Sequence, residues 1–127
     1  MKYLGIDYGE KRVGVAVSDD SGSLAFAKTV LPNDKYLLEN VWRICAEEKI
    51  DEIIMGESFN FSGEPNFIMK DILNFKKEIE RHGLKVYLEP EFLTSAEAER
   101  IQGKNAKIDA SAAALILKSY LDKKSKI

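Results

Sequence analysis

Apolar and polar positions along the first third of the chain follow the short period that is typical of strands. Residues 3–6 form an apolar run, valines alternate with smaller residues over 13–17, and residues 24–31 form a third run that ends at Pro32. Period-two patterns and short apolar runs bounded by turn residues indicate strands. Because only short turns separate the three segments, the pattern predicts an antiparallel meander.

Helices and compact apolar strands alternate over the rest of the chain. An apolar stripe at helical spacing over residues 37–45 follows Asn33 and Asp34, either of which can cap a helix. Further helices are expected over residues 64–82, 94–100 and 109–121, and further strands over residues 50–55 and 84–88. Right-handed crossovers place both later strands parallel to the first. The predicted fold is α/β: a five-stranded mixed sheet, three antiparallel strands and then two parallel ones, with the first strand central and helices flanking it.

Length and composition indicate one ordinary globular domain over residues 1–127. The chain has 45% hydrophobic and 31% charged residues, and its length suits a single core. No apolar run approaches the roughly 20 residues that span a bilayer, and no signal peptide is visible. A single cysteine, Cys45, forms no internal disulfide, so a cytoplasmic location is expected. The net charge of −2 gives no support to nucleic-acid binding, although acids gathered in one site would mask basic patches elsewhere.

Asp7 is out of place in this pattern, because it follows directly on the strand residues 4–6. A carboxylate is a poor strand residue, and burying its charge without a partner is costly. Two explanations are open at this point. Asp7 holds a cation, or it makes local hydrogen bonds in the turn over residues 7–12, where Gly9 is free to adopt a positive φ.

Further acidic residues follow the carboxyl ends of the predicted strands. Asp7 ends the first strand, Glu57 follows the fourth, Glu89 and Glu91 follow the fifth, and Asp109 opens the last helix. Such strand ends meet in one cleft beside a switch in strand order. Carboxylates a few ångströms apart repel one another, so such a cluster calls for divalent cations. Two Mg²⁺ ions would stabilise both the attacking and the leaving oxygen of a phosphodiester displacement. Each acid also has a local explanation: Asp109 as an N-cap, Glu89 as a solvent-facing loop residue, and Glu57 as part of a turn.

Two segments at opposite ends of the chain resemble the motifs of one family. Residues 5–19 read GIDYGEKRVGVAVSD, and residues 108–122 read IDASAAALILKSYLD. They closely resemble the opening motif and the closing helix of the YqgF family, and the resemblance covers essentially the whole chain. Members of that family are bacterial RNase H-like proteins, described as Holliday-junction resolvases and as the nuclease that matures the 5′ end of 16S ribosomal RNA. The resemblance implies an RNase H-like fold and a metal-dependent nuclease.

The resemblance also implies a catalytic and metal-binding triad. Asp7 falls on the family's first catalytic carboxylate and Asp109 on its last. The middle carboxylate comes from a segment of the form Asp-Glu-Arg-Leu-Thr-Thr, in which Glu91 matches the acidic position. Pro90 and Phe92 replace its charged neighbours, so phosphate contact by an arginine after the middle acid is not expected here.

The loop after the fourth strand is a second departure from the family pattern. The family has Gly-Leu-Pro at this place, whereas the chain has Gly-Glu-Ser at residues 56–58. Glu57 is therefore an additional or substitute candidate for the metal site. In other RNase H-like nucleases an acid at the end of the fourth strand binds metal.

The expected substrate is nucleic acid, either precursor ribosomal RNA or branched DNA. The expected cofactor is Mg²⁺, or Mn²⁺ in its place, and the protein would act as a monomer or a homodimer. Lys11 and Arg12 lie beside Asp7 in the sequence and are expected to meet substrate phosphate, unless they belong only to an exposed turn. Thr94 and Ser95 fall on the family's Leu-Thr-Thr segment and are also expected to contact substrate.

Two other functions fit parts of the same pattern. Residues 7–14 also resemble the phosphate loop of the actin, hexokinase and chaperone ATPase superfamily, but those proteins bind nucleotide between two such domains and this chain provides one. The second alternative is a protein that keeps this fold and binds nucleic acid or ribosomes without catalysing cleavage. The departures from the family pattern at residues 56–58 and 90–92 are consistent with it.

Overall fold

The computed structural model describes residues 1–59, 67–92 and 106–125. Over these residues the chain runs through five strands and three helices. In chain order they are β1 (Tyr3–Tyr8), β2 (Arg12–Ser18), β3 (Ala25–Pro32), α1 (Leu37–Glu48), β4 (Glu52–Phe59), α2 (Met69–Arg81), β5 (Lys85–Phe92) and α4 (Ala106–Ser125).

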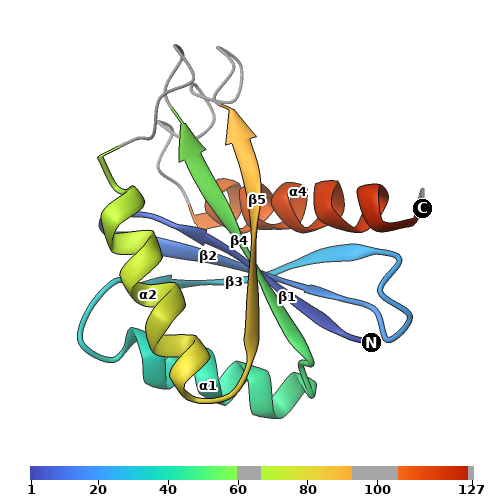
Figure 1. Ribbon diagram of the computed structural model, residues 1–127, viewed down its shortest axis with the longest axis horizontal. Helices are drawn as coiled ribbons and strands as arrows, with labels where there is room; N and C mark the ends of the chain where they lie inside the picture. The colour runs from blue at the N-terminus through green and yellow to red at the C-terminus, as the bar shows by residue number, and fades with distance from the viewer. Residues whose placement is uncertain (60–66, 93–105, 126–127) are drawn as a thin grey trace.

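The five strands form one mixed sheet in the order β3-β2-β1-β4-β5, with β1 in the centre (Figure 1). β1 pairs antiparallel with β2, and β2 pairs antiparallel with β3. β4 is parallel to both β1 and β5. The predicted sheet is therefore confirmed in strand number, in strand order and in the direction of every pair. The switch in strand order lies at β1, between an antiparallel neighbour and a parallel one.

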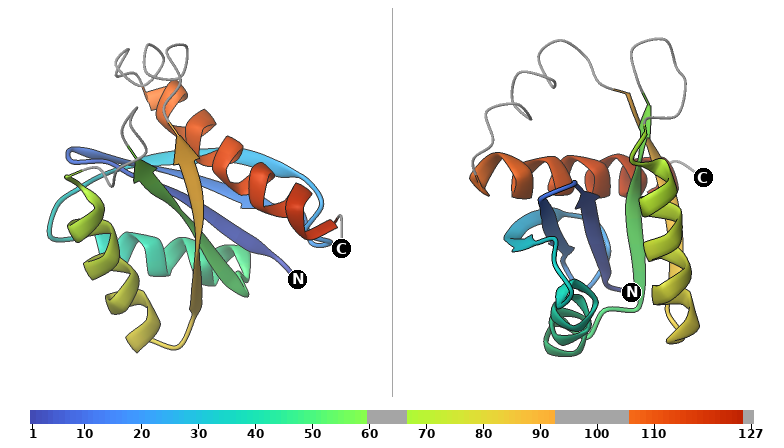
Figure 2. Two further views of the ribbon diagram at one scale, coloured as in Figure 1. Left: turned by 45° about the horizontal axis from the view of Figure 1, so that its top comes forward. Right: turned by 90° about the vertical axis from the view of Figure 1, so that its left-hand side faces the viewer.

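Helices cover both faces of the sheet: α1 and α2 lie on one face and α4 on the other (Figure 2). Alternate residues of each strand point to opposite faces. Leu4 and Ile6 accordingly belong to the larger core with α1 and α2, whereas Tyr3 and Ile54 belong to a second core with α4. Strand alternation therefore assigns each residue near the strand ends to one of two faces, and that assignment fixes which candidate site residues share a face.

α4 packs very closely against the sheet at Gly5 of β1. A Cβ at Gly5 would lie 2.8 Å from Leu117 Cβ and 3.0 Å from the carbonyl oxygen of Ala113. A methyl group does not fit there without a shift of the helix. The small residues of α4 and the glycine of β1 together let the helix rest directly on the central strand.

Strands β4 and β5 run further than the sequence pattern predicts. β4 continues to Phe59 and β5 to Phe92, and the two pair with each other through Phe59↔Phe92. Residues 56–58 and 89–92, predicted as loops, are therefore strand. Turn-forming residues there keep an extended conformation because each strand supplies the backbone partners of the other.

The ends of all three described helices differ from the sequence prediction. α2 begins at Met69, after a turn at residues 67–68 that the predicted helix over residues 64–82 included. α1 begins at Leu37, and neither Asn33 nor Asp34 caps it. The Asp34 carboxylate accepts a hydrogen bond from the Tyr36 N–H instead. The side-chain amide of Asn33 donates a hydrogen bond to the carbonyl of Gly9. α4 begins at Ala106, one turn earlier than predicted. The expected helix over residues 94–100 lies outside the described residues.

Candidate active site

Asp7 lies near the carboxyl end of the central strand, on the face covered by α4. It pairs in register with Gly14 of β2, and its side chain is half-buried. Tyr3 and Gly5 precede it at alternate positions of β1, and both contact α4. Strand alternation therefore places Asp7 on the same face. This position is at the switch in strand order, where sheets of this kind bind ligands.

The amino-terminal end of α4 lies level with Asp7. Tyr3 contacts Tyr120 with ring centroids 5.9 Å apart, and two residues further along β1 Gly5 approaches Ala113 and Leu117. The helix thus runs antiparallel to β1. Two strand residues advance about 6.6 Å, and four helical residues advance about 6 Å. The next step along both elements brings Asp7 level with the first turns of α4.

Asp109 lies in that first part of α4, three positions after Ala106. It is inside the helix, so the explanation of Asp109 as an N-cap is wrong. A carboxylate in the first turn of a helix is favoured by the helix dipole. The backbone at positions 7 and 109, which are 102 positions apart in the sequence, thus lies at the same end of the sheet.

Glu91 lies in β5 and pairs with Ser58 of β4. Tyr87 and Glu89, at alternate positions of the same strand, both contact α4: the Tyr87 ring stacks on Tyr120, and the Glu89 carboxylate binds Ser119. Position 91 therefore belongs to the α4 face, the face of Asp7 and Asp109. The backbone thus puts positions 7 and 91 on the face that α4 covers, and position 109 in α4 itself.

Glu57 lies on the opposite face. Ile53 and Met55, at alternate positions of β4, belong to the core with α1 and α2, and no register shift occurs between Met55 and Phe59. Glu57 therefore faces α2, and we leave it out of the metal site that we consider below. The sequence predicted that Glu57 lies near the carboxyl end of β4. It did not predict on which face of the sheet Glu57 lies, because the strand was expected to end at residue 55.

Glu89 has a role that the sequence did not reveal. Its side chain is 4% exposed, and Oε2 accepts hydrogen bonds from Ser119 Oγ at 2.8 Å and from Lys123 Nζ at 2.6 Å. The explanation of Glu89 as a solvent-facing loop residue is therefore wrong. Among the described residues, Ser119 and Lys123 of α4 stabilise this buried carboxylate.

Lys11 and Arg12 lie where the β1–β2 turn returns the chain to the sheet. Lys11 is exposed, and Arg12 is half-buried at the start of β2. The turn is fixed by the segment before α1, since the Asn33 N–H donates to the Lys11 carbonyl at 2.9 Å. Both residues therefore lie at the same end of the sheet as Asp7. The other two predicted substrate contacts, Thr94 and Ser95, lie outside the described residues.

Several other acids are held by partners away from this end of the sheet. Backbone hydrogen bonds from Leu24 and Ser23 lower the pKa of Asp19, and hydrogen bonds from Lys2 and Lys28 lower the pKa of Glu48. Among the side chains that the structure describes, no three of His, Cys, Asp and Glu form a potential metal site. Asp7 is the one member of the predicted triad in that set.

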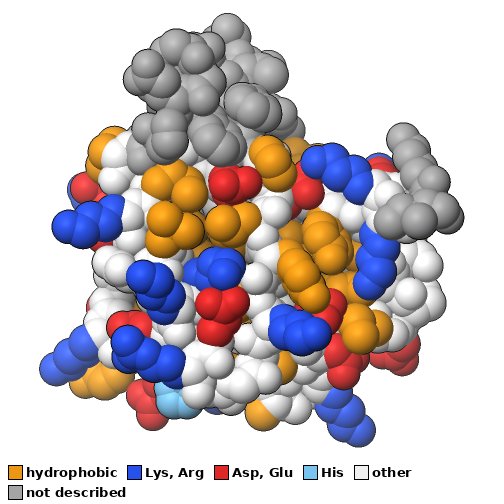
Figure 3. All heavy atoms as spheres, in the orientation of Figure 1, with side chains coloured by type: hydrophobic (Ala, Val, Ile, Leu, Met, Phe, Trp, Pro, Cys, Tyr) orange, Lys and Arg blue, Asp and Glu red, His pale blue; other side chains and the backbone are white. Residues whose placement is uncertain are grey.

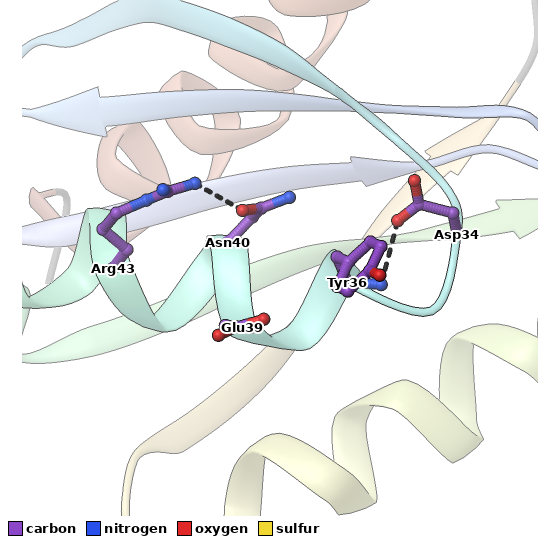
Figure 4. Close-up of a pocket in the computed structure, with 5 residues that line it drawn as sticks. All are labelled: Asp34, Tyr36, Glu39, Asn40 and Arg43. Carbon is purple, nitrogen blue, oxygen red and sulfur yellow. Dashed lines mark hydrogen bonds between the residues drawn. The ribbon is translucent and has the colours of Figure 1, made fainter.

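The described surface in the view of Figure 3 carries charges of both signs. Over α2, β5 and α4, basic and acidic side chains are interspersed among hydrophobic ones (Figure 3). An open pocket of about 410 Å³ lies along α1, lined by Asp34, Tyr36, Glu39, Asn40 and Arg43 (Figure 4). It contains none of the predicted site residues. Across the described ranges, the helices are all too short or too polar to cross a membrane.

Comparison with known proteins identifies relatives that match along the whole chain. The family model described as "RuvX: Holliday junction resolvase" matches residues 1–123. A protein of Nitratidesulfovibrio vulgaris named "Putative pre-16S rRNA nuclease" is 37% identical over 134 residues, which cover 96% of this chain and 94% of the relative. A protein of Oenococcus oeni with the same name is 34% identical, covering 100% of this chain and 98% of the relative.

Solved structures of two resolvases share the fold. RuvC of Thermus thermophilus, in complex with a Holliday junction substrate, superposes with a TM-score of 0.60 at 13% identity, covering 98% of this chain and 96% of the other. The Holliday junction resolvase of fowlpox virus has a TM-score of 0.58 at 19% identity, covering 97% of this chain and 99% of the other. These likenesses confirm the RNase H-like architecture.

Proposed function

Since the chain belongs to the RuvX family, we propose that it is a nuclease that hydrolyses phosphodiester bonds in structured nucleic acid, with precursor 16S ribosomal RNA as its substrate. The observation that carries this proposal is the shared position of the three predicted acids. In support of it, positions 7 on β1 and 91 on β5 share the α4 face by strand alternation, and position 109 lies in α4 itself. The relatives' names support the choice of RNA.

The three acids suit a divalent metal ion. Carboxylate oxygens are the ligands that Mg²⁺ prefers, and Mn²⁺ accepts the same donors. Asp7, Glu91 and Asp109 would hold the ion, and Asp7 is half-buried at the strand end as such a ligand requires. When bound, the metal supplies Lewis acidity and lowers the pKa of a coordinated water molecule.

The chain's own residues would then bind and orient the substrate. Lys11, in the exposed turn beside Asp7, would contact a phosphate as a point charge, and Arg12 would contact one through its planar fork. Such contacts neutralise phosphates of the nucleic acid and do not depend on its base sequence. They would hold the scissile phosphate against the three acids.

Branched DNA is the second candidate substrate. The matching family model carries the description of a Holliday junction resolvase, which favours it. A four-way junction is symmetric, so cleavage of both strands would call for a homodimer, whereas cleavage of an RNA end requires only a monomer. The oligomeric state in the presence of substrate therefore bears on the choice.

The test is a cleavage assay with both substrates. The pure protein is incubated with precursor 16S ribosomal RNA and with a synthetic four-way DNA junction, each in Mg²⁺ and in EDTA. We expect Mg²⁺-dependent cleavage of the RNA at a defined position. Cleavage of the junction alone would transfer the assignment to branched DNA. Tight binding of either substrate without cleavage would favour a nucleic-acid binder without catalytic activity. ATP binding in calorimetry, without cleavage of either substrate, would favour a relative of the actin, hexokinase and chaperone ATPase superfamily.

A further inference from the structure

Strands β4 and β5 continue beyond the body of the sheet as a two-stranded ribbon. The pairing of β1 with β4 ends at Ile6↔Met55, whereas β4 and β5 pair on from Gly56↔Glu89 to Phe59↔Phe92. Their ends project past the other strands in Figure 1. A pair of strands without further neighbours is marginally stable in water. The ribbon therefore needs contacts to its faces, and it is the ribbon that carries position 91.

Glu89 lies at the base of this ribbon, in the first residue pair beyond the end of the β1–β4 pairing. Its buried carboxylate accepts hydrogen bonds from Ser119 and Lys123 of α4. Those two residues are four positions apart and so lie on the same face of the helix. Lys123 is 63% exposed, which lets its charge remain hydrated while its ammonium group holds the carboxylate. The result is a charge-assisted polar link between β5 and α4.

α2 contacts the backbone of the ribbon at β4. The Ser58 N–H donates to the sulfur of Met69 at 3.1 Å, and a thioether is a weak acceptor. The ribbon is thus held between a weak contact to α2 and a strong ionic contact to α4. α4 is also the element that carries Asp109.

From these contacts we propose that Glu89 is a positioning residue for the metal site. Bound to Ser119 and Lys123, it fixes the ribbon to α4 and thereby fixes Glu91 relative to Asp109 and Asp7. The inference rests on the proposed function, because it concerns the three acids named there. Glu89 itself is not a metal ligand in this proposal, since Ser119 and Lys123 occupy Oε2.

Substitutions at Glu89 test the proposal, with a control at Glu52. Glu89→Gln keeps an oxygen acceptor for Ser119 and Lys123, whereas Glu89→Ala removes it, and Glu52→Gln changes a half-buried acid at the opposite end of β4 as a matched control. Three quantities are measured: Mn²⁺ affinity by electron paramagnetic resonance, the cleavage rate as a function of Mg²⁺, and the midpoint of thermal unfolding. Residues that orient metal ligands typically change metal affinity or activity by about 10-fold or more.

We expect Glu89→Ala to weaken Mn²⁺ binding about 10-fold and to raise the Mg²⁺ concentration for half-maximal cleavage by a similar factor. Glu89→Gln should stay within about threefold of wild type, and Glu52→Gln should match wild type. Lys123→Met alone should weaken Mn²⁺ binding less than Glu89→Ala does. Combined with Glu89→Ala it should add nothing, because Glu89→Ala already removes the contact with Lys123.

Each contrary result has a distinct meaning. If Glu89→Gln loses Mn²⁺ affinity as fully as Asp7→Asn does, Glu89 is a ligand and the positioning role is wrong. If Glu89→Ala lowers the unfolding midpoint but leaves Mn²⁺ affinity unchanged, the link is structural only. A wild-type protein that binds Mn²⁺ but cleaves neither substrate overturns the proposed function alone. A wild-type protein that does not bind Mn²⁺ overturns both.

Discussion

Gly5 and Leu117 are in such close contact that a side chain at Gly5 would place its Cβ 2.8 Å from the Cβ of Leu117. The separation between the central strand and the last helix is therefore set by the absence of one methyl group. Because Asp7 follows Gly5 on the strand and Asp109 precedes Leu117 on the helix, the same contact sets the spacing of the two acids.

Gly5→Ala should therefore impair stability and activity together. Overpacking of a close contact costs typically about 1–3 kcal/mol, and the outward shift of α4 would separate Asp109 from Asp7. Urea unfolding and the cleavage rate at saturating Mg²⁺ provide the two measurements. Gly83→Ala is the matched control: Gly83 has a φ of 103° and nothing within 4 Å of its missing Cβ. It should cost about 1 kcal/mol through backbone strain and leave the cleavage rate unchanged. A Gly5→Ala protein that is as active as wild type would contradict the close-packing argument.

Asp7→Asn should abolish Mg²⁺-dependent cleavage while the protein stays folded. The amide keeps the shape of the carboxylate but loses the charge that a metal ligand supplies, so we expect a rate reduction of about 100-fold or more. Asp20→Asn is the control, because the Asp20 side chain is 99% exposed and follows β2 at the opposite end of the sheet. Retention of wild-type cleavage by Asp7→Asn would remove Asp7 from the metal site.

Lys11→Ala should weaken substrate binding more than it slows the bond-breaking step. Loss of one phosphate contact is expected to raise KM several-fold, leave kcat within about twofold, and reduce the dependence of binding on salt concentration by about one counterion. Lys85→Ala removes an exposed lysine at the start of β5, away from this end of the sheet, and should change none of these quantities. If Lys11→Ala and Lys85→Ala have equal effects, substrate phosphate is attracted by lysines over the whole surface and not by Lys11 in particular.

The Glu48 carboxylate should contribute stability at neutral pH that is lost in acid. Hydrogen bonds from Lys2 and Lys28, each 2.9 Å long, lower its pKa from the ordinary value of 4.5. A group whose pKa is lowered by folding stabilises the folded state above its unfolded pKa, and that contribution fades as the pH falls through the folded pKa. Glu48→Gln should thus cost up to about 1 kcal/mol at pH 7 and progressively less below pH 4.5. Urea unfolding at several pH values measures this difference. A cost that does not change with pH would assign it to packing.

The sheet could be predicted because its signals are local. Alternating valines and short turns define β1 to β3, and the crossover rule then leaves one place for β4 and β5. Asp7 was recognisable for the same reason: a carboxylate directly after an apolar strand violates the pattern that surrounds it. Both inferences depend on sequence neighbours only.

The side-chain faces and partners at the strand ends could not be predicted, because they depend on contacts between distant segments. Glu57 was placed at the correct level but its face required the register of β4 past Met55. The sequence predicted Glu89 to be an exposed loop residue. Its hydrogen-bond partners, Ser119 and Lys123, are 30 and 34 positions away, so the neighbouring residues gave no sign of them. Glu91 and Asp109 were selected from the family resemblance, and their roles stay predictions.

The contact between Tyr3 and Lys124 joins residues 121 positions apart, and it has a consequence for the order of events during synthesis. A ribosome makes β1 before α4. Until α4 has emerged and docked on the central strand, the nascent chain lacks Asp109 and lacks cover for one face of the sheet. The proposed metal site, which includes Asp109, is therefore complete only after α4 has been made and has packed on β1.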